Sequence, residues 1–208
     1  MKTIIVNGSP RKNWNTAQLM SEAKKGAESV ASEVTYIDLY DLNFTGCRSC
    51  MACKRKGIDN PCKCFWKDDL SAVIEDIYSA DHLIIGSPIY HGEPTGLVRC
   101  LLERVTFPPL SYDDYSSLFK GKVNVDIVLT MNAPENIYKQ YYEENMKAYF
   151  EPFHFLNGTI TITPVYDTLQ VKDYTKYDMG SFSEEHKKAV HDTTFVHDLE
   201  RAFQIGKS

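Results

Sequence analysis

The sequence predicts an α/β fold with a five-stranded parallel sheet and helices on both of its faces. Short β-branched runs alternate along the chain with longer segments whose apolar residues recur at helical spacing. The strand runs are continuously apolar, as in Ile4-Ile5-Val6, which is typical of strands buried on both faces. Because parallel neighbours are joined by crossover connections, this alternation places helices on both faces of the sheet.

The predicted elements follow one another in a regular order. The strands occupy residues 2–6, 34–37, 82–85, 123–129 and 159–163. The helices occupy residues 15–30, 68–79, 96–105, 134–153 and 184–205. Asp68 and Asp69 suit the first turn of the second helix, where carboxylates interact favourably with the helix dipole. The polar, turn-rich residues 166–183 are predicted to form a surface excursion before the last helix.

Length and composition favour one domain. A chain of 208 residues with no repeat or Gly/Ser linker is expected to form a single domain over residues 1–208, with a cysteine-rich loop at 46–65 inserted after the second strand. A net charge of -5 argues against a nucleic acid partner, which needs a basic stripe. No apolar run suits a membrane helix or a signal peptide, so we expect a cytoplasmic protein without a membrane partner.

The loop after the first strand has the features of a phosphate-binding site. Residues 8–17 run from a strand into a helix, whose free N–H groups and positive dipole end favour a phosphate. Ser9, Asn15 and Thr16 add neutral donors, and Arg11 adds charge. The loop lacks the glycine motifs for nucleoside triphosphates and dinucleotides, which leaves a phosphomonoester as the natural ligand. The alternative is a capped helix start with Asn15 or Thr16 as the N-cap.

Three segments together carry a family resemblance. They are Gly8-Ser9-Pro10-Arg11 through Asn15-Thr16-Ala17, then Gly86-Ser87-Pro88-Ile89-Tyr90, and then Gly96 to Arg104. With these segments the chain resembles the NADPH-dependent FMN reductase family of flavodoxin-like proteins, including its iron-sulfur flavoprotein branch. The resemblance implies a flavodoxin-like fold and FMN as cofactor. It also implies that the FMN phosphate is held by Ser9, Arg11, Asn15, Thr16 and Ala17.

A second loop, residues 87–92, is expected to lie beside the flavin ring. The resemblance implies that the ring neighbours are Pro88, Ile89, Tyr90, His91 and Gly92. Both loops leave the carboxyl ends of adjacent strands, where open α/β sheets bind ligands. Tyr90 offers an aromatic face to the ring, and a core position for Tyr90 is the alternative. N–H groups near Gly92 suit flavin N5 or O4. His91 is either a proton donor to reduced flavin or an exposed loop residue.

The cysteine pattern predicts metal or redox chemistry rather than a disulfide framework, because five of the six cysteines crowd into residues 47–64. Cys47-x2-Cys50-x2-Cys53 has the spacing of 4Fe-4S cluster ligands, which take a fourth cysteine from farther along the chain. Either Cys62 or Cys64 is this fourth ligand, and the acidic pair that follows favours Cys64. The run resembles the iron-sulfur flavoprotein motif, with a longer gap after Cys53. Redox-active thiols and a zinc site are the alternatives.

These features predict an FMN-binding oxidoreductase. It is expected to take electrons from NAD(P)H or a ferredoxin-type donor and to reduce a small acceptor such as a quinone, nitro compound, metal ion or oxygen. A flavodoxin-type electron carrier without turnover is the alternative, and a zinc-stapled binding module is a third hypothesis. The aromatic stripe within residues 138–153 is mostly expected in the core but leaves room for an interface. The resemblance implies a homodimer or homotetramer.

Overall fold

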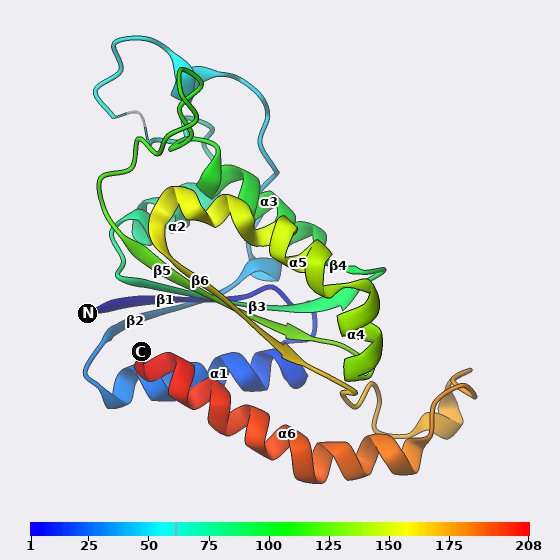
Figure 1. Ribbon diagram of the computed structural model, residues 1–208. Helices are drawn as coiled ribbons and strands as arrows, with labels where there is room; N and C mark the ends of the chain where they lie inside the picture. The colour runs from blue at the N-terminus through cyan, green and yellow to red at the C-terminus, as the bar shows by residue number, and fades with distance from the viewer. Residues whose placement is uncertain (61) are drawn as a thin grey trace.

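The computed structural model describes residues 1–60 and 62–208. Its central sheet has the strand order β2-β1-β3-β5-β6, and these neighbours are all parallel (Figure 1). The strands are β1 (Lys2–Asn7), β2 (Glu33–Asp38), β3 (His82–Tyr90), β5 (Val123–Thr130) and β6 (Asn157–Val165). The predicted five-stranded parallel sheet is therefore confirmed. Its order reverses between β1 and β3, and open α/β sheets form a ligand crevice at such a switch point.

A short additional strand, β4 (Glu93–Pro94), pairs antiparallel with the end of β3. The sequence does not predict it, because two residues are too few to carry a periodic pattern. His91 and Gly92 form the turn between the two strands, with φ angles of 52° and 83°. Positive φ at both central residues is the geometry that two-residue hairpin turns favour. The end of the predicted ring loop is therefore a tight hairpin.

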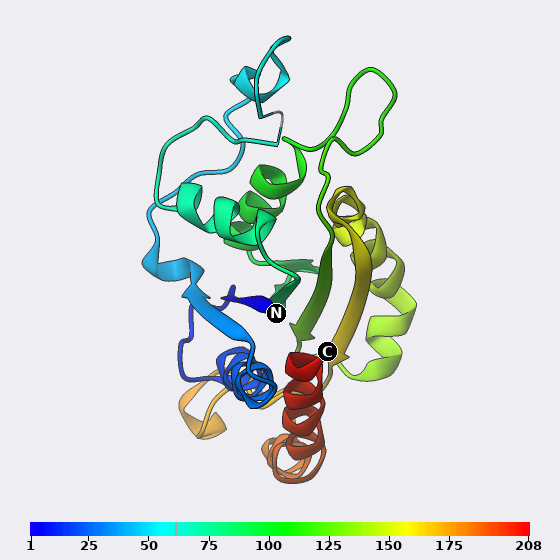
Figure 2. The ribbon, with the colours of Figure 1, turned by 90° about the vertical axis from the view of Figure 1, so that its left-hand side faces the viewer.

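Helices cover both faces of the sheet, as predicted (Figure 2). One face carries α1 (Asn15–Ser29) and α6 (Glu184–Lys207), which lie side by side in both views. The other face carries α2 (Leu70–Tyr78), α3 (Gly96–Thr106), α4 (Glu135–Tyr141) and α5 (Glu143–Phe150). Each face buries its own apolar cluster against the sheet. The sheet is thus the middle layer of three.

The prediction of one long helix over residues 134–153 is wrong. The chain forms α4 and α5, separated at Tyr142 (φ -121°, ψ -26°), and then a 3-10 helix, η3 (Glu151–Leu156). Hydrogen bonds from Tyr142 N to Tyr138 O and from Met146 N to Tyr142 O, both 2.8 Å, keep helical spacing across the break. Periodicity therefore does not reveal the kink. Pro152 lacks the N–H that a continuing α-helix needs.

Helices α1 and α6 approach each other closely through two glycines. A Cβ on Gly26 would lie 1.9 Å from Phe203 O, and one on Gly206 would lie 1.9 Å from Ala23 O. Real side chains do not fit at such distances, so glycine at both positions allows the two helices to pack. None of the helices in the described ranges combines the length and hydropathy that crossing a membrane requires.

The described residues of the cysteine-rich segment, 46–60 and 62–65, lie above α2 and α3 in Figure 1, beside the loop 107–122 (Figures 1 and 2). It follows β2 and the short 3-10 helix η1 (Leu39–Asp41), and it contains η2 (Ala52–Lys54). A further 3-10 helix, η4 (Tyr174–Lys176), interrupts the segment between β6 and α6. Residue 61 lies outside the described residues, so the predicted loop 46–65 is described here on both sides of it.

Candidate functional site

Three loops meet where β1, β3 and β5 end. The N–H of Gly8 donates to Gly86 O at 2.7 Å, and the Thr95 hydroxyl donates to Gly8 O at 2.8 Å. At the start of α1 the hydroxyls of Thr16 and Thr130 share a hydrogen bond of 2.7 Å. These bonds tie the predicted phosphate loop to the ends of β3 and β5. The loop backbone is thus positioned from two neighbouring strands.

The first turn of α1 keeps its N–H groups free of side-chain caps. The N-cap residue is Trp14, and within the described chain no side chain accepts a capping hydrogen bond there. The alternative in which Asn15 or Thr16 caps the helix is therefore wrong. The Ser9 hydroxyl instead accepts from Arg11 N at 3.1 Å and shapes the loop before the helix. Uncapped first-turn N–H groups suit an anion.

A narrow cavity of about 110 Å³ lies between these loops. Most of the predicted cofactor-binding residues line it, together with residues from the ends of β5 and β6. They are Ser9, Arg11, Asn15, Thr16, Pro88, Ile89 and Tyr90, with Trp14, Thr130, Met131, Asn132, Thr168 and Gln170. Ala17 is not among them and instead lines a separate surface hollow together with Tyr36.

A larger cavity of about 760 Å³ adjoins the narrow one, and the two share Ile89, Met131 and Asn132. His91 and Gly92 line this larger cavity rather than the narrow one. Its other walls come from the β5–α4 loop, from the kink between α4 and α5 and from the C-terminal part of the chain. These residues are Ala133, Pro134, Tyr142, Asp167, Ser181, Phe182, Ser183, His186 and Lys187. The volume lies within the range of about 300–1,000 Å³ typical of ligand pockets.

The start of the segment after β6 is part of the site, which the sequence did not predict. Leu169 O accepts hydrogen bonds from Trp14 Nε1 at 3.0 Å and from Asn15 Nδ2 at 2.8 Å. Gln170 O accepts from Arg11 Nη1 at 2.7 Å. Thr168 and Leu169 are 3% and 8% exposed, so they do not belong to a surface excursion. The contacts run through backbone carbonyls, which leave no signal in the sequence.

A buried lysine connects α6 to the same loops. Lys187 is 3% exposed, and its Nζ donates to Asn132 O at 2.7 Å and to the Asp167 carboxylate. His186 Nε2 lies 2.8 Å from the other Asp167 oxygen. Burial raises the pKa of Asp167, but the hydrogen bonds and charges of Lys187 and His186 outweigh it and lower that pKa overall. These contacts attach α6 to Asn132 and Asp167 in the wall of the larger cavity.

The side chains around the cavities fit FMN. Tyr90 is 46% exposed, so its alternative position in the core is wrong and its ring is free to face a ligand. Burial, followed by the charge of Tyr40, raises the pKa of Tyr90, so the phenol stays neutral near pH 7. Asn132 lines both cavities, and its Oδ1 is buried without a partner among the described residues. An unpaired acceptor there suits a hydroxyl or ring N–H of a ligand.

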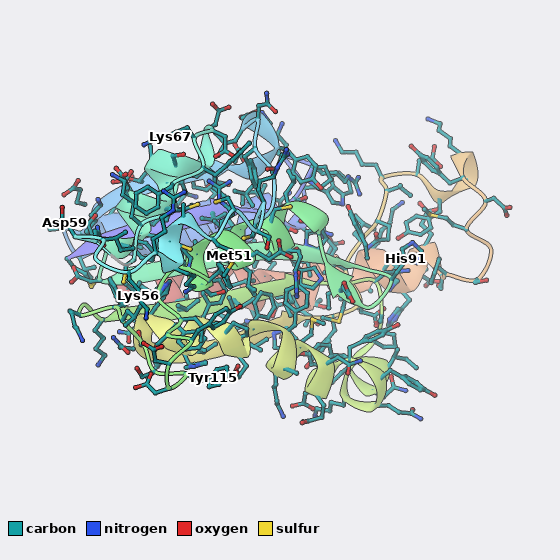
Figure 3. All side chains as sticks on the ribbon, turned by 90° about the horizontal axis from the view of Figure 1, so that it is seen from above. Met51, Lys56, Asp59, Lys67, His91 and Tyr115 are labelled. Atoms are coloured by element: carbon teal, nitrogen blue, oxygen red, sulfur yellow. The ribbon has the colours of Figure 1, made fainter. Side chains whose placement is uncertain are left out.

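All six cysteines are free thiols. Cys47 and Cys50 are exposed, Cys64 is half-buried, and Cys53 and Cys62 are buried. Seen from above, Met51 of the cysteine-rich segment lies away from His91 of the hairpin turn (Figure 3). Within residues 1–60 and 62–208, no group of three or more His, Cys, Asp or Glu side chains is arranged to hold a metal ion.

The thiols interact electrostatically. Burial raises the pKa of Cys53, Lys54 lowers it, and the charges of Cys64, Cys47 and Cys50 raise it further. Burial also raises the pKa of Cys62, where the other contributions come from Lys54 and Lys120. The charges of Cys47, Cys50 and Cys64 therefore all act on Cys53. Four thiolates are a donor set that suits an iron-sulfur cluster or zinc.

The model of the NADPH-dependent FMN reductase family matches residues 1–131 of the chain. The protein belongs to this family. The match covers both predicted ligand loops, the cysteine-rich segment, and the chain as far as the end of β5. The family resemblance seen in the sequence is therefore confirmed, and the family supports FMN as the cofactor.

This family member has curated relatives named iron-sulfur flavoproteins. One from Methanocaldococcus jannaschii is 34% identical over 104 residues, which is 50% of this chain and 51% of the relative. One from Archaeoglobus fulgidus is 35% identical over 104 residues, covering 50% of this chain and 48% of the relative. The alignment with these curated relatives thus spans about half of their length.

Solved structures share the fold of this family member. An NAD(P)H:quinone oxidoreductase from Methanothermobacter marburgensis aligns with a TM-score of 0.72 at 14% identity, covering 100% of this chain and 96% of that one. An NADH:FMN oxidoreductase aligns with a TM-score of 0.56 at 16% identity, covering 99% and 88% of the two chains. At these identities the likeness supports the flavodoxin-like fold alone.

Proposed function

We propose that this chain binds FMN and acts as an oxidoreductase, passing electrons from NAD(P)H or a ferredoxin-type donor to a small acceptor. The observation that carries the proposal is the pair of adjoining cavities at the β1/β3 switch point. The proposed phosphate-binding groups and the exposed Tyr90 line the narrow cavity, and Asn132, whose amide oxygen has no partner among the described residues, lines both cavities. Membership of the FMN reductase family supports the same cofactor.

The residues divide into two sets in this proposal. Ser9, Arg11, Asn15, Thr16 and the N–H of Ala17 hold the phosphate at the start of α1. Pro88, Ile89, Tyr90, His91 and Gly92 bind and orient the ring. Bound FMN supplies hydride acceptance and single-electron release.

In the proposal, the hairpin turn of His91 and Gly92 borders the larger cavity beside the flavin ring. His91 lines the larger cavity, so it is able to hold a proton at its imidazole for transfer there. Gly92 lies against the Tyr142 ring, and a Cβ on Gly92 would lie 3.2 Å from that ring. The turn thus lies beside the kink between α4 and α5.

The larger cavity is the proposed meeting place of donor and acceptor. It is lined by apolar and aromatic groups, such as Ile89, Pro134 and Phe182, together with polar groups. This composition suits a flat, partly apolar acceptor such as a quinone or a nitro compound. Names of structural neighbours include quinone oxidoreductases, which is consistent with that class.

The proposal extends to a 4Fe-4S cluster on Cys47, Cys50, Cys53 and Cys64. It is supported by the spacing of these cysteines in the sequence and by the names of the curated relatives. The proposal also treats residues 1–208 as one flavodoxin-like domain of a cytoplasmic homodimer or homotetramer. Light scattering on the purified protein measures the oligomeric state.

The first experiment is a visible absorption spectrum of anaerobically purified protein, with iron and acid-labile sulfide measured on the same sample. Flavin bands are expected, with broad extra absorption and equal amounts of iron and sulfide from the cluster. Flavin without iron would leave an FMN oxidoreductase without a cluster. A protein without flavin would contradict the proposed function. Steady-state turnover with NADH or NADPH then separates an enzyme from an electron carrier.

A further inference from the structure

Asp167 and His186 form a carboxylate–histidine pair in the wall of the larger cavity. Both residues line this cavity of about 760 Å³, and His186 Nε2 lies 2.8 Å from Asp167 Oδ2. Asp167 comes shortly after β6, whereas His186 belongs to the first turn of α6. The fold thus brings together two side chains from different segments, and the proposed function gives neither of them a chemical role.

Asp167 is held in place through both its backbone and its side chain. Its N–H donates to Ala133 O at 3.0 Å, in the loop after β5. Its Oδ1 accepts a hydrogen bond from Lys187 Nζ, which also donates to Asn132 O at 2.7 Å. The carboxylate is therefore presented to His186 from a position that β5, β6 and α6 set together.

The ionisation of Asp167 determines which ring nitrogen of His186 bonds to it as a donor. Burial raises the pKa of Asp167, but the hydrogen bonds and charges of Lys187 and His186 outweigh it and lower that pKa overall. Near neutral pH the group is a carboxylate, which only accepts hydrogen bonds. Nε2 is therefore the nitrogen that donates to Asp167, and Nδ1 is left for a ligand. A carboxylate bonded in this way fixes the tautomer and the orientation of a catalytic histidine.

His186 combines this fixed position with access to solvent. Its side chain is 56% exposed, whereas the side chain of Lys187 beside it is 4% exposed. The N–H of His186 donates to the Ser183 hydroxyl at 3.2 Å, which caps α6. Histidine changes its charge between about pH 5 and pH 8, so an exposed ring gives up a proton and regains one from water. The pair thus has the parts of a proton donor.

The rest of the cavity suits an acceptor that takes up protons. Ile89, Pro134 and Phe182 give it an apolar lining, and Ile89 also lines the narrow cavity. Two-electron reduction of a quinone requires protons at its oxygens, whereas a one-electron acceptor such as ferricyanide takes up none. Two histidines line this cavity. His91 lies in the hairpin turn, and His186 is the one that bonds a carboxylate within residues 1–60 and 62–208.

We propose that His186 donates a proton to a quinone in the larger cavity and that Asp167 is its positioning residue. This inference rests on the proposed function, which supplies the hydride. A hydride transferred from the reduced cofactor converts the quinone to a hydroquinone monoanion, so the cofactor is oxidised and the quinone is reduced by two electrons. The Nδ1–H bond of the imidazolium then breaks as the O–H bond of the hydroquinone forms. The neutral ring regains its proton from water.

The first test measures ligand binding without turnover. The probe is naphthol, whose hydroxyl resembles that of a hydroquinone, added to the oxidised holoprotein. We expect naphthol to shift the NMR resonance of the His186 ring, which is assigned by its absence from His186→Gln. By calorimetry, His186→Gln is expected to bind naphthol roughly 2- to 10-fold more weakly, because one hydrogen bond is lost. His197→Gln changes an exposed histidine of the same helix and is expected to bind like the parent protein.

The second test follows the reoxidation of dithionite-reduced holoprotein by its flavin absorbance, without oxygen. Menadione is the quinone, and ferricyanide is the acceptor that needs no proton. His186→Gln is expected to lower the rate with menadione by roughly 100-fold and to keep the parent rate with ferricyanide. Asp167→Asn is expected to lower the menadione rate in the same selective way, whereas His197→Gln keeps both rates. A merely structural role would change the two rates together.

Either of two results would overturn the inference. One is a His186 resonance that naphthol does not move, and the other is a His186→Gln variant whose rates with menadione and ferricyanide keep the parent ratio. Because His186 is exposed, its replacement is expected to leave the fold and the FMN content intact. The proposed function is tested separately on the parent protein. A parent that lacks FMN contradicts that function, whereas a parent that binds FMN and reduces both acceptors supports it whatever the variants do.

Discussion

Arg11 has two kinds of contact at the mouth of the narrow cavity. Its Nη1 donates to Gln170 O at 2.7 Å, and its guanidinium lies 4.2 Å from the centre of the Trp14 ring. Most of its N–H donors are therefore left for a ligand, and the stacking holds the group over the phosphate loop. Trp14 thus orients Arg11.

Arg11→Ala is expected to weaken FMN retention by roughly 10- to 100-fold, because hydrogen bonds to charged groups contribute about 1.5–3 kcal/mol. Fluorescence titration of flavin-depleted protein with FMN measures the change. Lys25→Ala is the control, since it removes the same charge from an exposed position on α1. Equal affinities in the two variants would argue against the phosphate assignment.

Asp167 makes the stability of the site dependent on pH. Its pKa is lowered in the folded protein, so its pairing with Lys187 and His186 is fully present above the unfolded pKa of about 4. The stabilisation is lost as the pH falls through the lowered pKa of the folded state. Asp167 also has a φ of 57°, which asparagine tolerates well.

Asp167→Asn is expected to reduce the free energy of unfolding by roughly 1–3 kcal/mol at neutral pH, because it leaves the buried Lys187 without its countercharge. Urea unfolding of both proteins over a pH series measures this difference. The difference is expected to stay constant above about pH 5 and to shrink below about pH 4. A difference that does not change down to about pH 3 would show that Asp167 does not act through its charge.

At the scale of the elements, the contact between α1 and α6 depends on glycine. In an exposed helix, alanine is more favourable than glycine by about 1 kcal/mol. At Gly26, however, the added Cβ would lie 1.9 Å from Phe203 O, so the two helices must separate. Steric strain and helix propensity therefore act in opposite directions at this position.

Gly26→Ala is expected to destabilise the protein, because overpacking typically costs about 1–3 kcal/mol and exceeds the gain in propensity. Gly96→Ala is the control, since a Cβ on this helical glycine meets nothing within 4 Å. Thermal unfolding of the two variants checks the prediction. It fails if the midpoint of Gly26→Ala rises above that of the parent protein.

The helices and strands also show which elements the periodicity of apolar residues predicts. Continuous apolar runs such as Leu83-Ile84-Ile85 identified the buried strands, since these residues are 0% exposed. Periodicity did not predict the kink at Tyr142, because hydrogen bonds of helical spacing cross it. Periodicity did not predict the strand β4 either, because this strand is only two residues long. Local patterns therefore predict long regular elements, whereas a single-residue interruption depends on what the chain packs against.

At the scale of the whole molecule, the sequence predicted the loops that follow the strands. It did not predict the contacts between segments that are distant along the chain. Ser9, Asn15 and Tyr90 were identifiable because they follow predicted strands or start a predicted helix. The carbonyl of Leu169 was not, since any residue offers the same group. Arg104 resembles an ordinary surface charge on a helix, and only the tertiary structure shows that it is buried.

The two-part construction of the cavities bears on how the protein has diverged. The family match ends at Met131, and the residues that follow supply Asp167, Lys187 and the carbonyls of Leu169 and Gln170. The matched portion carries the proposed cofactor loops, while later residues line much of the larger cavity. Divergence in these later residues is therefore expected to change the preferred acceptor before it changes the binding of FMN.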